Sequence, residues 1–236
     1  MISGLLQGKI AIVFGAGGSI GSAAAKEFAV EGAQLFLAGR TWAHVEGVMR
    51  QIAARGGRAE AAMVNALDDG AVNEYLDRVV SKTGRIDAVF NATGPLAREY
   101  GNGKYAVDLK IEEFTLPLTT VVKSQFITAR AAARHMIKQR SGVIIFLTGS
   151  PARGHAQGTT AIGAAFGAIE SLTENPSDRA GPVRCKGCLP SYDGKHGQPY
   201  HPRNSGGLGW RNERHQGSDD RTNGRHELPQ SPCQRF

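Results

Sequence analysis

A cluster of glycines directly after an apolar run is the first feature of this sequence that could do chemistry. The run 9–14 has strand character, and the helical pattern 22–30 starts as soon as the cluster ends. Because glycine has no Cβ, such a turn lets backbone N–H groups and a helix N-terminus approach a phosphate closely. An ordinary connection between a strand and a helix would also explain the glycines, so the phosphate interpretation depends on the units that follow. The residues expected to hold the phosphate are Gly15, Gly17, Gly18, Ser19, Ile20 and Gly21.

Strands and helices alternate along the chain as far as Asn175. Apolar periodicity predicts further strands at 34–38, 59–64, 86–90 and 143–147, and helices at 42–54, between Asp68 and Gly84, at 117–137 and at 161–173. Parallel strands joined by right-handed helical crossovers form a sheet that is covered on both faces. The sequence therefore predicts an α/β fold, a doubly wound parallel sheet of Rossmann type in three α/β/α layers.

Composition and charge argue against several classes of protein. The formal charge is +7, but the basic residues are scattered and aromatic residues make up only 7%, so we expect no nucleic-acid partner. No apolar run approaches the roughly 20 residues that a membrane span needs, and the N-terminus does not resemble a signal peptide. We expect a soluble, cytoplasmic protein.

The cysteines suggest a zinc site only weakly. Cys185 and Cys188 form a Cys-x-x-Cys pair ahead of His196 and His201, and Cys233 follows near the end of the chain. One pair followed by two irregularly spaced histidines is a poor match to zinc-ligand spacing. We expect no metal site.

Beyond Asn175 the character of the sequence changes. Most of the ten prolines and all three cysteines lie there, without isoleucine and with Val183 as the only valine. The segment shows neither strand nor helix periodicity, so we expect a folded domain over 1–175, an irregular tail over 176–236 and the absence of the last strands. One explanation is a disordered interaction tail. The explanation we prefer is translation in a shifted reading frame, which the two other frames of the coding DNA would test.

From residue 6 to 175 the chain resembles the short-chain dehydrogenase/reductase family. The family pattern after the first strand is Thr-Gly-x-x-x-Gly-x-Gly. Here Phe14 stands at the threonine, Gly15 and Gly21 match, and Ser19 replaces the middle glycine. The two glycines ahead of this serine keep the turn open, so the resemblance implies a binding site for a nicotinamide dinucleotide.

Two further segments resemble cofactor-binding motifs of this family. The stretch 91–94, Asn-Ala-Thr-Gly, is similar to the family's Asn-Asn-Ala-Gly after the fourth strand, and Asn65-Ala66 lies where the family has an aspartate that contacts adenine. An asparagine amide can make the same hydrogen bond. The resemblance therefore implies cofactor contacts from Asn65, Ala66, Asn91, Ala92 and Gly94.

The residues at the end of the second predicted strand indicate which nicotinamide cofactor the protein prefers. An acidic residue there would accept hydrogen bonds from a ribose 2′-hydroxyl and repel a 2′-phosphate. This sequence has Gly39, then Arg40 and Thr41. A guanidinium and a hydroxyl both suit phosphate oxygens, so they favour NADP, with NAD as the alternative. A surface arginine at a strand end would also explain Arg40.

The family resemblance implies a catalytic set of Asn, Ser, Tyr and Lys, and most of it is replaced here. Alignment of the helix 161–175 puts Ile162 at the tyrosine and Phe166 at the lysine. The family serine falls on Gly149, so Ser150 is the nearest candidate. Hydride transfer produces an oxyanion that needs a proton donor, and the nearby histidine that could supply the proton is His155.

Three interpretations stay open. The chain is an oxidoreductase that transfers hydride to or from a small carbonyl or alcohol, with Ser150, His155 or water supplying the proton. Alternatively, it binds NAD(P) without catalysis, as a sensor or partner subunit, or it is a truncated or frame-shifted product without function. The resemblance also implies a homo-oligomer formed through the helices 117–140 and 161–175.

Overall fold

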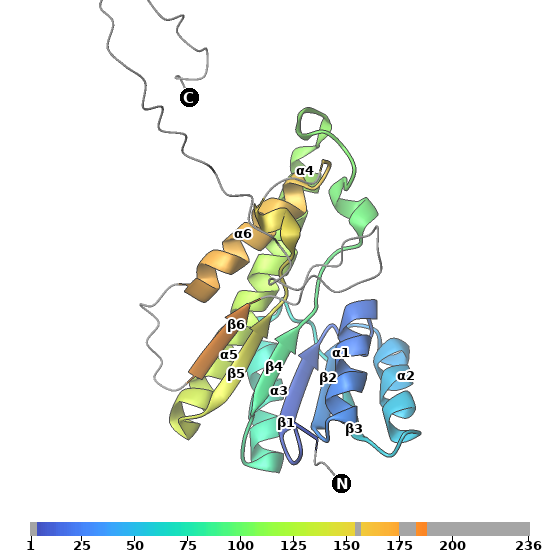
Figure 1. The fold of residues 1–236 in the computed structure, drawn as a ribbon, viewed down its shortest axis with the longest axis vertical. Helices are drawn as coiled ribbons and strands as arrows, with labels where there is room; N and C mark the ends of the chain where they lie inside the picture. The colour runs from blue at the N-terminus through green and yellow to red at the C-terminus, as the bar shows by residue number, and fades with distance from the viewer. Residues whose placement is uncertain (1–3, 154–156, 175–182, 188–236) are drawn as a thin grey trace, which may run out of the picture. The chain divides into compact units, whose positions relative to one another are not determined.

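The computed structural model describes residues 4–153, 157–174 and 183–187 (Figure 1). Its strands form one sheet in the order β3-β2-β1-β4-β5-β6, and each neighbouring pair is parallel. The strands are β1 (Ile10–Phe14), β2 (Gln34–Gly39), β3 (Arg58–Met63), β4 (Ala88–Asn91), β5 (Gly142–Phe146) and β6 (Val183–Gly187). The strand order reverses between β1 and β4, which is the point where open sheets of this kind bind ligands at their carboxyl edge.

The helices connect these strands. They are α1 (Ser19–Val30), α2 (Trp42–Ala53), α3 (Asp69–Thr83), α4 (Ile111–Pro117), α5 (Lys123–Gln139) and α6 (Thr160–Glu174). Among the described helices, none has the length and apolarity required to cross a bilayer.

Two separate apolar clusters show that the sheet is covered on both faces (Figure 1). Side chains of β1 alternate between them: Ile12 and Phe14 belong to the cluster with α3, α5 and α6, whereas Ala11 and Val13 belong to the cluster with α1 and α2. This alternation is the consequence of the two-residue period of a strand. The predicted doubly wound α/β/α architecture is confirmed.

Helix α3 begins and ends at the residues that the sequence predicts. The Asp68 carboxylate accepts a hydrogen bond of 3.0 Å from the backbone N–H of Ala71, which satisfies one of the free donors of the first turn. Gly84 ends the helix with φ +76°, a left-handed conformation that glycine adopts without a steric penalty.

The predicted helix 117–137 differs from the structure at its start. The helical region begins at Ile111, and a wide π-helical turn, Leu118–Val122, separates α4 from α5. Pro117 ends α4 and has no N–H to donate to the preceding turn. The regular hydrogen-bond ladder is interrupted there, and the π turn follows directly.

The expectation that no strand follows residue 175 is wrong. Strand β6 lies parallel to β5, with Val183 opposite Gly142 and Gly187 opposite Phe146. Its sequence, Val-Arg-Cys-Lys-Gly, contains a single β-branched residue and no apolar alternation. The pairing of its backbone with β5 makes it a strand, and propensity does not reveal such tertiary pairing. The described sheet therefore has one strand more than the sequence predicts.

Candidate functional site

The glycine-rich turn after β1 is folded tightly on itself. Gly15 has φ +70°, and a Cβ on Gly21 would lie 2.2 Å from the Gly15 carbonyl oxygen. A Cβ on Gly17 would lie 2.7 Å from the Cβ of His44 on α2. These glycines are required because backbone or neighbouring side chains occupy the space that any other side chain would need.

Helix α1 begins at Ser19, three residues earlier than predicted, so Ser19, Ile20 and Gly21 form its first turn. Gly18 is the N-cap and Gly18 and Ser19 are exposed to solvent, as is 47% of Ile20. The first turn contains no acidic residue. Its free N–H groups and the positive end of the helix dipole therefore face solvent, an arrangement that suits a phosphate group.

The segment after β4 lies against this turn. A Cβ on Gly15 would come within 2.8 Å of the backbone of Ala92 and Thr93, so the two segments are in close contact. Asn91 is buried, and its amide donates to the Thr128 hydroxyl at 3.0 Å and accepts from the Thr93 N–H at 2.8 Å. The Asn91 side chain is thus used within the protein, where it fixes the backbone that leads to the exposed Gly94.

The end of β2 carries two exposed polar side chains beside the glycine-rich turn. Arg40 is exposed and forms no ion pair with the carboxylates of the described residues. Thr41 is the exposed N-cap of α2, and the Ala16 N–H donates to the Ala38 carbonyl at 3.1 Å, which holds the turn against β2. A cationic group and a hydroxyl are therefore exposed close to the glycine-rich turn.

Asn65 and Ala66 follow β3 at the same edge. The side-chain oxygen of exposed Asn65 accepts a hydrogen bond of 3.2 Å from the Leu67 N–H, whereas Ala66 is buried. Among the described residues, the Asn65 amide nitrogen donates no hydrogen bond, so it is free to donate to a ligand.

Two of the positions implied for catalysis, Ile162 and Phe166, carry apolar side chains. Ser150 is exposed at the start of the short 3-10 turn Ser150–Arg153, and His155 lies outside the described residues. Ile162 is buried, and a Cβ on Gly149 would lie 3.2 Å from the Cε2 atom of Phe166. Within the described part of this site, an aromatic ring therefore lies against the glycine where the family resemblance places a hydroxyl.

The loop between β4 and α4 is held in place by charged groups. Glu113 of α4 accepts hydrogen bonds from the Lys104 ammonium at 2.6 Å and from the Lys110 N–H at 3.1 Å, and these contacts hold its pKa below the usual value. The Gly103 N–H donates to the Gly158 carbonyl at 2.7 Å, which joins this loop to the segment before α6. The two loops thus meet at the carboxyl edge of the sheet, where open sheets of this kind bind ligands.

Sequence reasoning missed the residue that positions the end of β5. Gln125 of α5 is buried at 1% exposure, and its amide donates to the Leu147 carbonyl and accepts from the Leu147 N–H, both at 2.9 Å. This double contact fixes the backbone immediately before Thr148. The available signal was a polar residue within the apolar face of a predicted helix, since buried polar groups normally have partners.

Comparison with known proteins agrees with this geometry. A family model described as short chain dehydrogenase matches residues 9–192. The chain belongs to the short-chain dehydrogenase family. The predicted family membership is therefore confirmed.

Similar proteins include a dehydrogenase and a reductase. The chain is 30% identical over 191 residues to a 7alpha-hydroxysteroid dehydrogenase of Clostridium sardiniense, covering 80% of this chain and 72% of that protein. It is 28% identical over 140 residues to the 3-oxoacyl-[acyl-carrier-protein] reductase FabG of Thermotoga maritima, and spans only 55% of that relative.

Solved structures of this family have the same fold. An NAD+-bound xylitol dehydrogenase aligns with a TM-score of 0.73 at 29% identity, covering 80% of this chain and 72% of that one. A metagenomic short-chain oxidoreductase in complex with NADP aligns with a TM-score of 0.69 at 25% identity, covering 79% and 84% of the two chains.

Proposed function

We propose that this protein is an oxidoreductase that binds NADP and transfers hydride to or from a small carbonyl or alcohol substrate. The first turn of α1 holds the pyrophosphate, and Arg40 with Thr41 holds the 2′-phosphate. The observation that carries this proposal is the exposed Arg40 guanidinium, without an ion pair among the described residues, beside the glycine-rich turn. A guanidinium forms two charge-assisted hydrogen bonds with a phosphate, whereas a neutral 2′-hydroxyl can accept only a weaker, uncharged hydrogen bond from it.

The cofactor preference is tested by substituting Arg40. In Arg40→Ser the dissociation constant for NADPH should rise about tenfold or more, which corresponds to about 1.4 kcal/mol, while that for NADH changes less than about twofold. Arg55→Ser, an exposed arginine after the end of α2, is the matched control. Equal losses for both nucleotides, or no loss for either, would contradict the assignment of Arg40 to the 2′-phosphate.

The proton donor is a separate part of the proposal. Ser150 and His155 are the candidates, and turnover of NADPH with a panel of ketones and aldehydes tests both. Because two characterised relatives act on a hydroxysteroid and on xylitol, the panel should include steroid and sugar ketones. Loss of turnover in Ser150→Ala or His155→Ala, with NADPH binding unchanged, supports a catalytic role for that residue.

One observation favours a second function, nucleotide binding without catalysis. The Phe166 ring lies against Gly149 and Ile162 is buried, so the two positions where the family resemblance places lysine and tyrosine carry no proton donor. The expected result for this alternative is tight NADPH binding with no oxidation across the panel. Measurable turnover of any carbonyl substrate would exclude it.

We also propose that the protein self-associates through α5 and α6. Exposed apolar side chains on these helices support this proposal: Phe126 and Ile137 on α5 are 47% and 45% exposed, and Leu172 on α6 is 37% exposed. Sedimentation of the wild type and of Phe126→Glu is the test, since a charge in an apolar interface should shift the assembly toward monomer.

A further inference from the structure

His44, the third residue of α2, lies directly against the glycine-rich turn. A Cβ on Gly17 would come within 2.7 Å of the His44 Cβ and within 3.4 Å of its backbone carbonyl carbon. A Cβ on Gly39, the last residue of β2, would lie 2.7 Å from the Cγ2 atom of Val45, the next residue of α2. The start of α2 is therefore fixed against both the glycine-rich turn and the end of β2.

The imidazole of His44 is available to a ligand. The residue is exposed, and no hydrogen bond or ion pair joins its side chain to another described residue. Because the Cα–Cβ bonds of a helix tilt toward its N-terminus, this side chain projects toward the end of α2 where Arg40 and Thr41 lie. Thr41 precedes His44 by three residues, a spacing that puts two side chains on one face of a helix. An imidazole, a hydroxyl and a guanidinium are therefore exposed at one end of α2, beside the glycine-rich turn.

The residues next to His44 along the chain carry no unpaired negative charge. Glu46 is the only carboxylate of α2, and it pairs with Arg50 at a distance of 2.9 Å. The first turns of α1 and α2 contain no acidic residue, and the charged residue between β2 and α2 is Arg40. The immediate surroundings of the imidazole are thus neutral or positive, which favours an anion as its partner.

The elements packed against α2 do not supply a carboxylate for this imidazole either. On α1 (Figure 1), the titratable residues Lys26 and Glu27 lie about two turns beyond the first residue, whereas the contact with α2 is made by the turn ahead of that helix. On β3, Arg58 is the first residue, at the opposite end of the strand from the turn, and Glu60 pairs with Lys82 of α3 at 2.8 Å. Within the described chain, a protonated imidazole therefore has no acidic partner, and a phosphate bound at the turn would be its nearest anion.

We propose that His44 makes the cofactor preference depend on pH: its imidazolium binds the 2′-phosphate of NADP together with Arg40 and Thr41. This inference rests on the proposed binding of NADP. A histidine side chain changes its charge between about pH 5 and pH 8, and its cation forms charge-assisted hydrogen bonds with phosphate oxygens. The 2′-hydroxyl of NAD carries no charge, so protonation should strengthen the binding of NADP and leave that of NAD nearly unchanged. The site then discriminates between the two nucleotides more strongly at pH 6 than at pH 8.

The test is calorimetric titration of the full-length chain with NADP+ and with NAD+ at pH 6 and pH 8. A phosphate monoester itself takes up a proton near about pH 6, so each variant is compared with the wild type at the same pH, which cancels that effect. His44→Gln keeps a hydrogen-bond donor and loses the charge; it should weaken NADP+ binding about fivefold at pH 6 and less than about twofold at pH 8. His44→Lys carries its charge at both pH values and should bind NADP+ more tightly than the wild type at pH 8.

His135→Gln is the matched control. This histidine belongs to α5, which packs on the opposite face of the sheet from α2, and its Nε2 atom lies 3.1 Å from a carboxylate oxygen of Asp77. The variant should reproduce the wild-type dissociation constants at both pH values. The melting temperature of each variant shows whether it is folded under the conditions of the titration.

Several results would overturn the inference. Equal losses for NADP+ and NAD+ in His44→Gln would assign the imidazole to the pyrophosphate, and a loss that is the same at pH 6 and pH 8 would show that its charge is not used. Unchanged binding in both His44 variants would show that it does not contact the cofactor. A folded wild type that binds no NADP+ at either pH would contradict this inference and the proposed function together. The expected pH pattern without turnover of any substrate would support the role of His44 and contradict only the proposed hydride transfer.

Discussion

Replacement of Gln125 tests whether one buried amide fixes the end of β5. Gln125→Leu removes two hydrogen bonds of 2.9 Å and leaves the N–H and C=O of Leu147 without their partner. Each orphaned group costs about 1–3 kcal/mol, and the buried leucine returns about 1–2 kcal/mol through its larger apolar surface. The centre of these ranges predicts that the free energy of unfolding falls by about 2–3 kcal/mol.

Gln125→Glu makes the same prediction dependent on pH. A protonated glutamic acid can donate to the Leu147 carbonyl and accept from its N–H, as the amide does, whereas the ionised form can only accept and is buried. Burial and the facing carbonyl favour the protonated form, so the pKa of this carboxyl is raised in the folded state. Its stabilising contribution is complete below the unfolded pKa of about 4.3 and is lost as the pH rises through the folded pKa.

The assay is urea unfolding of wild type, Gln125→Leu and Gln125→Glu between pH 4 and pH 8. The leucine variant should show a loss that is constant with pH, and the glutamate variant a loss that grows with pH. Gln51→Leu, at an exposed position of α2, is the control and should change stability by less than about 0.5 kcal/mol. A leucine variant as stable as the control, or a glutamate variant whose loss is independent of pH, would refute the role assigned to this amide.

Three further predictions concern the framework that holds the site. Asp87→Ala should lower the free energy of unfolding in urea by about 3 kcal/mol, because the buried Ile10 N–H loses its acceptor. Asp87→Asn keeps an acceptor oxygen and should lower it less. Equal losses of stability in the two variants would contradict this role of Asp87. The hydrogen bond from Arg130 holds the Asp69 pKa below its ordinary value. The stability that this contact adds is therefore present above about pH 4 and is lost as the pH falls through the lowered pKa. The melting temperatures of wild type and Asp69→Asn should converge in acid. Gly84→Ala should cost about 1 kcal/mol from its left-handed backbone alone, since no atom lies within 4 Å of the added methyl, and an unchanged midpoint of unfolding would show that the helix ends differently.

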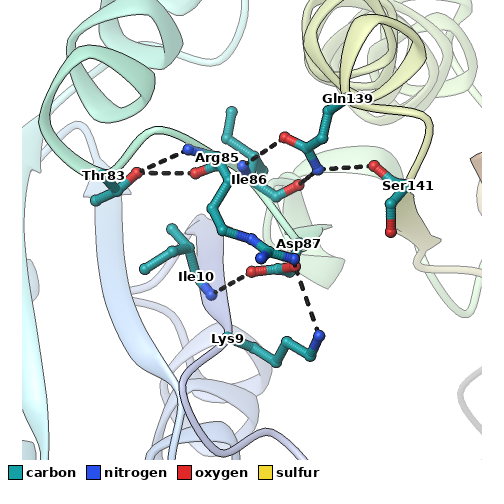
Figure 2. Close-up of polar contacts among 8 residues, drawn as sticks. All are labelled: Lys9, Ile10, Thr83, Arg85, Ile86, Asp87, Gln139 and Ser141. Atoms are coloured by element: carbon teal, nitrogen blue, oxygen red, sulfur yellow. Dashed lines mark hydrogen bonds and ion pairs between the residues drawn. The ribbon is translucent and has the colours of Figure 1, made fainter.

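Helix α5 is joined to the sheet at both ends by the same chemistry. Gln139 donates to the Ile86 carbonyl at 2.7 Å and accepts from the Ile86 N–H at 3.0 Å (Figure 2), as Gln125 does with Leu147. The two glutamines lie about four turns apart and therefore project from one face of the helix. They fix α5 against β4 at the amino edge and against β5 at the carboxyl edge, where the candidate site lies.

Local signals in the sequence determined most of the architecture. The apolar periods place the first five strands and the helices that connect them, because burial of one face requires a period of two or of 3.6. Asp68 and Gly84 mark the ends of α3 through a side-chain acceptor and a left-handed residue, both of which act within a few residues. The glycine-rich turn and Arg40 likewise predict a phosphate site from neighbouring positions alone.

Tertiary contacts decided the remainder. Strand β6 is a strand because its backbone pairs with β5, and its own sequence contains little strand propensity. The sequence predicts Asn91 as a cofactor contact, and only the fold shows that its amide also donates to Thr128, which lies 37 residues away. A hydrogen bond forms only between groups that folding brings within about 3 Å of each other. A local pattern of residues does not indicate which distant groups reach that distance.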